Sequence, residues 1–220
     1  MSLKVSSDPY GYKKLLVYRK AEELQGACAA FTSHFPRLKT LYALQDQMDR
    51  SARSVKQNIV EGWKRNSTQE YHQFLGFSMG ANAELEEDCD DIIKGRYEMG
   101  GRGIRGLEGE KWEGKGEMGG RGNPSPLTLD EVERLPFYPF NPHLPPLVQL
   151  KLRCKELNFL LTKLQTSLHQ KMQSGTEGII GSAWGTGERG KGAQDFLVKM
   201  IDDAGLEKLP DGHLVPKKKV

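Results

Sequence analysis

The stretch LKTLYALQDQMDRSARSVKQNIVEGWKRN, which runs from Leu38 to Asn66, decides the fold of this chain. Its apolar residues are spaced three and four positions apart, which places them on one face of a helix. They are Leu41, Leu44, Met48, Ala52, Val55 and Ile59. At about 100° per residue, Arg50, Arg53 and Lys64 project from the opposite side. The stretch therefore predicts a long amphipathic helix with one buried face and one polar, mostly basic face.

Three further stretches show the same helical spacing. The first covers residues 12–34 and ends before Pro36, whose ring removes a hydrogen-bond donor and disfavours helix in the preceding residue. The second begins after Ser67, which forms a capping box with Glu70. The third covers residues 145–174 and has a proline at its start. Four such helices can bury their apolar faces together, so the sequence predicts an all-α, antiparallel up-down four-helix bundle.

One segment differs sharply in composition from the predicted helices, and we expect it not to join the core. Residues 95–122 contain 11 glycines in 28 positions, too little apolar material to offset the entropy of ordering them. The proline-rich string PFYPFNPHLPP follows, and we expect it to be extended along the bundle, with Phe137, Tyr138 and Phe140 packed against it. The chain thus divides into helices one to three at 12–94, a low-complexity and Pro-rich insertion at 95–144, the fourth helix at 145–174, and a Gly-rich linker with a short helix and a basic tail at 175–220.

The overall composition limits the classes of function only weakly. The net charge of the 220 residues is +3, and residues 1–94 carry 13 basic and 13 acidic side chains, so bulk charge neither favours nor excludes a nucleic-acid partner. The cysteines, Cys28, Cys89 and Cys154, form no CxxC motif and lie on apolar stripes, which is typical of reduced core thiols. No run of 18 apolar residues and no signal peptide occurs, so we expect a soluble, cytoplasmic protein without a membrane partner.

The sequence offers no arrangement typical of catalysis. A di-metal bundle enzyme needs Glu-x-x-His on two helices, and that pattern is absent from the chain. We therefore expect no catalytic residues, no metal site, no cofactor and no enzymatic activity.

The candidate nucleic-acid-binding residues are Arg50, Arg53, Lys64 and Arg65. Cations on one helix face can follow a phosphate backbone, because each neutralised phosphate releases counterions. The alternative is that three i,i+4 pairs satisfy these charges locally, which leaves a solvated or inter-subunit face. These pairs are Asp46–Arg50, Asp49–Arg53 and Glu61–Arg65.

Two other polar features have more than one interpretation. Six acids fall within residues 84–91, where like charges oppose the helix macrodipole. They are expected to face a basic surface of another subunit, to bind a cation, or to be solvated. Asn58 lies near an apolar stripe, and we expect it to cap or bridge to a neighbouring helix rather than to bind a ligand.

The chain also carries a family resemblance. The strings LLVYRKAEEL and LQDQMDRSARSVKQNIVEGWKRNSTQEYHQFLGFSMGANAELEEDC, with Phe35-Pro36 between them, resemble the four helix bundle protein family. That bacterial family includes proteins encoded in intervening sequences of large-subunit ribosomal RNA and accessory proteins of diversity-generating retroelements. The resemblance covers residues 12–93 and, more loosely, 146–173. The long insertion before the fourth helix and the tail past residue 175 depart from the family pattern.

The resemblance implies a small all-α protein without enzymatic activity, often a homopentamer, some members of which bind nucleic acid and a reverse transcriptase. The expected function is that of a homo-oligomeric accessory protein that binds RNA or DNA, assisting a reverse transcriptase or associated with rRNA. The alternative is a protein-interaction scaffold that does not bind nucleic acid.

Overall fold

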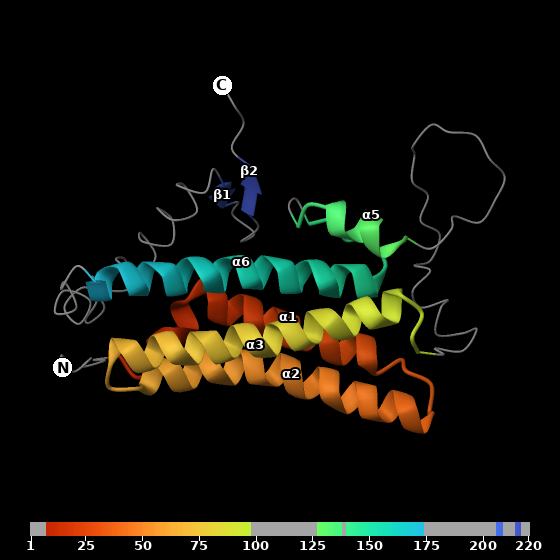
Figure 1. The fold of residues 1–220 in the computed structure, drawn as a ribbon, viewed down its shortest axis with the longest axis horizontal. Helices are drawn as coiled ribbons and strands as arrows, with labels where there is room; N and C mark the ends of the chain where they lie inside the picture. Colours follow the sequence, from red (N-terminus) through yellow and green to blue (C-terminus); the bar gives the residue numbers. More distant parts are fainter. Residues whose placement is uncertain (1–7, 98–126, 138–139, 174–205, 209–213, 217–220) are drawn as a thin grey trace.

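The computed structural model describes residues 8–97, 127–137 and 140–173, and two short strands at 206–208 and 214–216 (Figure 1). The elements are a 3-10 turn, η1 (Gly11–Lys14), the helices α1 (Leu16–Thr32), α2 (Lys39–Lys64), α3 (Thr68–Ile93), α5 (Leu129–Arg134) and α6 (Pro146–Gln173), and the strands β1 (Leu206–Lys208) and β2 (Leu214–Pro216). Most of the glycine-rich insertion and the short helix expected before residue 205 lie outside the described residues.

The four long helices form an antiparallel bundle (Figure 1). Each packs against two neighbours, in the ring order α1, α2, α3, α6. The direction is visible in the α2–α3 contacts, where Gln47 bonds to Asp88 and, further along α2, Val55 bonds to Ser78. Residue numbers rise on one helix while they fall on the other, so the two helices are antiparallel. The prediction of an all-α bundle is confirmed.

The predicted apolar stripes form one continuous core. All six stripe positions of α2 are buried, and α1, α3 and α6 contribute their own stripes to the same cluster. Gly62 allows α2 and α3 to approach closely, because a Cβ at this position would lie 2.7 Å from the Cβ of Phe74. The corner between α2 and α3 is therefore tightly packed.

The helix boundaries follow the local signals in the sequence. Helix α1 ends shortly before Pro36. At the start of α3, the predicted capping box is only half formed. The backbone N–H of Glu70 donates to the hydroxyl of Ser67, as expected. The Glu70 carboxylate, however, accepts from the Ser67 hydroxyl instead of from the Ser67 backbone N–H. The capping box of α5 is complete, with Thr128 and Glu131 each bonded to the other's backbone N–H.

Polar groups inside the bundle connect neighbouring helices. The hydroxyl of Ser78 donates to the carbonyl of Val55 at 2.8 Å, and Nδ2 of Asn82 donates to the carbonyl of Cys154 at 2.9 Å. The bridging role expected for Asn58 was wrong, because its Nδ2 bonds to Ser54 of its own helix. The three cysteines are buried and free.

Helix α5 and the start of the proline-rich string pack against α6. Val132 is fully buried in a second apolar cluster with Leu144, Val148 and Leu152. The ring of Phe137 lies 5.9 Å from that of Phe159, and the guanidinium of Arg153 lies 4.4 Å from the ring of Phe140. The expectation that these aromatic residues follow the bundle holds for both described rings.

The C-terminal part of the chain contains a small element that the sequence pattern did not predict. Strands β1 and β2 pair antiparallel, with Glu207 opposite Val215. In the part of the chain that the structure describes, no helix is long and apolar enough to cross a membrane.

Candidate nucleic-acid interface

Three of the four predicted binding residues share one exposed stripe of α2. At about 100° per residue, Arg50, Arg53 and Lys64 project within roughly 60° of one another, on the side of α2 opposite its buried positions. With a rise of about 1.5 Å per residue, the stripe is about 21 Å long. We call these three residues the α2 stripe.

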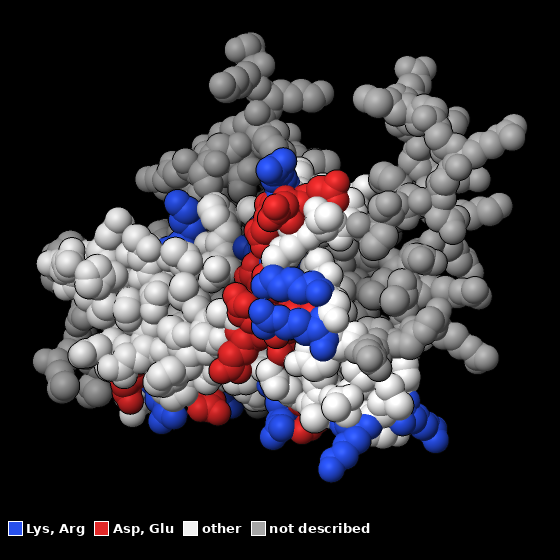
Figure 2. Space-filling view, turned by 45° about the vertical axis from the view of Figure 1, so that its right-hand side comes forward, with Lys and Arg blue, Asp and Glu red and all other residues white. Residues whose placement is uncertain are grey.

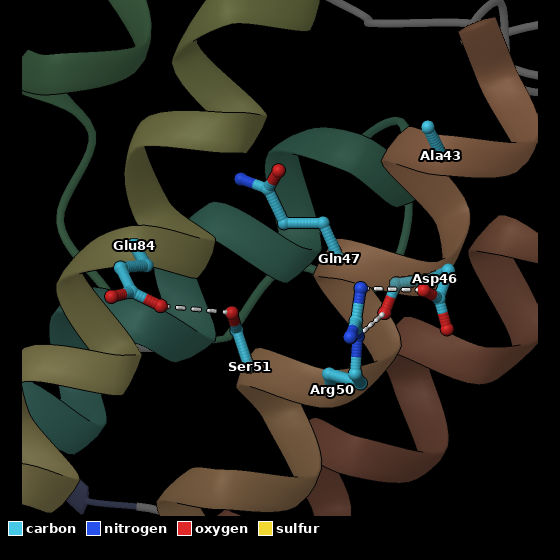
Figure 3. Close-up of a pocket in the computed structure, with 6 residues that line it drawn as sticks. All are labelled: Ala43, Asp46, Gln47, Arg50, Ser51 and Glu84. Atoms are coloured by element: carbon cyan, nitrogen blue, oxygen red, sulfur yellow. Dashed lines mark hydrogen bonds and ion pairs between the residues drawn. The ribbon is translucent and has the colours of Figure 1, made fainter.

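Arg50 is held by a neighbouring carboxylate. Its Nη2 lies 2.6 Å from Oδ2 of Asp46, and its Nε donates to the backbone carbonyl of the same residue (Figure 3). Both side chains are mostly exposed, so the pair stabilises the helix only slightly and solvent screens it. The predicted i,i+4 interaction is present at this position.

Arg50 also borders a polar groove between α2 and α3. The groove has a volume of about 390 Å³, and Figure 3 shows the hydroxyl of Ser51 directed across it to Glu84, to which it donates at 3.2 Å. The lining residues are Ala43, Asp46, Gln47, Arg50, Ser51 and Glu84. Because five of the six lining residues are polar or charged, and the charged ones bond to one another or to neighbouring polar groups, the groove does not resemble a binding site for an apolar small molecule.

Arg65 lies apart from the α2 stripe. It is the residue after the last turn of α2, and its guanidinium lies 4.5 Å from the ring of Phe74 on α3. Its Nη2 is 3.7 Å from a carboxylate oxygen of Glu61, so the predicted Glu61–Arg65 pair is present but long. The structure therefore does not group Arg65 with the other three cations.

Arg53 and Lys64 have no ion pair among the described residues. The predicted Asp49–Arg53 pair was wrong, because Oδ1 of Asp49 accepts from the hydroxyl of Thr32 at 3.0 Å. Asp49 lies on the side of α2 that faces α1, where the buried hydroxyl is a better partner than an exposed guanidinium. Two exposed cations are thus available to a ligand.

The acidic residues of α3 gather at one end of the bundle. In the view that brings the C-terminal end of α3 forward, acidic side chains form a band over this end of the bundle, with basic side chains beside it (Figure 2). Part of this charge is neutralised within the chain, since Asp91 pairs with Arg96 at 2.9 Å and both Glu86 and Asp90 contact Lys151 of α6. Sequence reasoning missed Lys151, which lies among apolar positions of its helix and is buried.

Asp88 is expected to make folding stability depend on pH. Its side chain is 6% exposed, Oδ1 accepts from Gln47 at 2.8 Å, and Oδ2 has no hydrogen-bond partner in the described part of the chain. Burial, together with the nearby Asp91 and Glu84, raises its pKa from 3.8 to about 6 although the Gln47 bond lowers it. The folded state therefore retains a proton that the unfolded chain has lost, and this contribution to stability disappears as pH rises from about 4 to about 6.

The variant Asp88→Asn tests this dependence. We expect it to match the wild type at about pH 4 and to exceed its unfolding free energy by about 1 kcal/mol at about pH 7, since the amide carries no charge. Urea unfolding across this pH range measures both proteins. A constant difference between them at all pH values would show that Asp88 does not titrate in this window.

One of the comparisons with known proteins finds a match to part of the chain. The model of the 23S rRNA-intervening sequence protein family matches residues 13–97, which contain α1, α2 and α3. The predicted family resemblance is thus confirmed over these residues, and α6 lies outside the match. No curated protein and no solved structure matches the chain.

Proposed function

We propose, from the match of residues 13–97 to the 23S rRNA-intervening sequence protein family, that this protein binds RNA through the α2 stripe. The observation that carries the proposal is the presence of two exposed cations, Arg53 and Lys64, without carboxylate partners in the described residues. The stripe is about 21 Å long, so its cations can contact several phosphates of one backbone. Contacts of this kind position a phosphate backbone and carry little sequence information.

The proposed role is non-enzymatic and cytoplasmic. Two polar groups of the core have partners on neighbouring helices, which suits a structural role for them. Asn82 bonds to a backbone carbonyl, and Lys151 is neutralised by carboxylates. The three buried, free cysteines suit a reducing compartment.

The proposal includes assembly with further copies of the chain. Leu38 and Tyr42 are 47% and 53% exposed at the N-terminal end of α2, where large apolar side chains favour contact with another protein surface. Light scattering on the free protein should give a mass several times 24.7 kDa.

The second candidate function is a protein-interaction scaffold, which the acidic band of α3 favours. A basic protein partner would complement this band, and nucleic acid would be repelled from it.

Fluorescence anisotropy of labelled RNA distinguishes the two functions. If the α2 stripe contacts phosphates, affinity should fall steeply with salt, with about 0.7 to 0.9 units of log–log slope for each contact. Short RNA oligonucleotides of unrelated sequence should bind with similar affinity, because the contacts are to the backbone. The absence of binding at low salt would exclude the RNA-binding function and leave the scaffold.

A further inference from the structure

Phe77 of α3 is a large aromatic residue that does not contribute to the core. It is 59% exposed and is not among the residues that form or cover either apolar cluster. Its ring lies 5.5 Å from that of Phe74, with the two planes at 84°. The side chain is thus held at its edge by one neighbour, while much of its surface remains in solvent.

The residues around Phe77 on α3 leave its ring accessible. Gly76 precedes it, and Gly80 lies one turn further along, where an added Cβ would meet no atom within 4 Å. Two glycines inside a helix each cost about 1 kcal/mol relative to alanine. The remaining exposed neighbours at this face are Gln73 and Glu84. Because these exposed neighbours on α3 are polar or charged, they argue against a second apolar protein surface as the partner of the ring.

Cations lie beside these aromatic rings at the corner between α2 and α3. The guanidinium of Arg65 stacks on Phe74 at 4.5 Å, and Lys64 precedes it in the chain. In antiparallel register with α3, Phe77 lies at the level of residues 54–58 of α2, between Arg53 and Lys64 along the bundle axis. Through Phe74, the exposed ring of Phe77 thus belongs to the same surface as the guanidinium of Arg65. Exposed rings together with cations are the combination by which proteins bind single-stranded nucleic acid, with stacking on bases and attraction to phosphates.

We propose that Phe77 stacks on an unpaired base of RNA whose backbone lies along the α2 stripe, so that the ligand is single-stranded or looped RNA. The proposal rests on the proposed function and specifies its substrate class. A base inside a duplex is stacked on both faces and offers only its edges to a protein. Phe77 can therefore contribute only where a base is unpaired.

The test compares Phe77→Ala with wild type on two labelled RNAs, an unstructured single strand and a fully paired duplex. Loss of one stacking contact should weaken single-strand binding about 5- to 100-fold and leave duplex binding and the salt slope unchanged. Phe77→Tyr, which keeps the aromatic ring, should bind within a factor of about two of wild type.

The outcomes separate the two proposals. If the wild type binds neither RNA at low salt, the RNA-binding function fails, and base stacking fails with it. If the wild type binds but Phe77→Ala loses nothing, or loses equally on both RNAs, base stacking is overturned and phosphate binding stands. The melting temperature of Phe77→Ala should equal that of wild type, because the ring is outside the core.

Discussion

Replacing Lys151 by methionine is expected to destabilise the bundle by about 3 to 5 kcal/mol, because it leaves the buried carboxylate of Asp90 without its cation. The ammonium of Lys151 contacts Asp90, lies 2.5 Å from Oε1 of Glu133, and lies 3.7 Å from Glu86. Burial alone would lower its pKa, but the bonds to Asp90 and Glu133 outweigh this effect and raise it. Urea unfolding at neutral pH measures the loss.

Lys155 provides a matched control on the same helix. It contacts Glu133 at 3.2 Å, but its side chain is only partly buried, so Lys155→Met should cost less than about 1 kcal/mol. The double variant with Lys151→Met and Asp90→Asn should recover part of the stability, since it removes the uncompensated charge. Equal losses for the two lysine variants would contradict the view that burial of the charge is what matters.

The apolar spacing predicted the bundle well because each helix has one wide buried face. The stripe predicted for α2 is buried at all six positions, and α6 begins at Pro146, one residue after the predicted start at 145. Burial of a stripe is a property of one helix and its periodicity, so it can be read locally.

Pairing between helices could not be predicted in the same way. Asp49 stands four residues before Arg53, which made a pair within the helix the obvious expectation, yet Asp49 bonds to Thr32 of α1. Lys151 is similar, since its spacing places it among core residues and its carboxylate partners come from α3 and α5. The partner of a polar group near a helix interface depends on which helix packs there and in which register, and no local pattern contains that information.

The candidate site was also only partly predictable. The angular positions of Arg50, Arg53 and Lys64 follow from helix geometry alone. Arg65 was grouped with them because it is adjacent in sequence, but the helix ends at Lys64 and the chain turns, so Arg65 stacks on Phe74 of α3. The role proposed for Phe77 could not be predicted from the sequence either, because it depends on the contact of Arg65 with Phe74, which lies beside Phe77.

Replacing Arg50, Arg53 and Lys64 together by glutamine is expected to lower the log–log salt slope of RNA binding by about 2 to 3 units. All three side chains are exposed, and glutamine has a helix propensity close to that of lysine and arginine. The melting temperature should therefore be retained while affinity at low salt falls. Lys163→Gln is a control for the loss of one positive charge outside the α2 stripe. Lys163 is an exposed residue of α6, which packs against α1 and α3. An unchanged slope in the triple variant would place the phosphate contacts elsewhere on the molecule.

The single substitutions should not contribute equally. Arg50 is paired with Asp46 at 2.6 Å, so it must leave this carboxylate, or share it, before it can bind a phosphate. Arg53 has no such competitor among the described residues, because Asp49 bonds to Thr32. We therefore expect Arg53→Gln to reduce the salt slope by close to one full contact, about 0.7 to 0.9, and Arg50→Gln by clearly less. Asp46→Asn should then strengthen binding, since it releases Arg50 and removes a repelling charge. If Arg50→Gln proves the more damaging of the two, its pairing with Asp46 is broken in the complex and the phosphate backbone lies nearer the N-terminal end of α2.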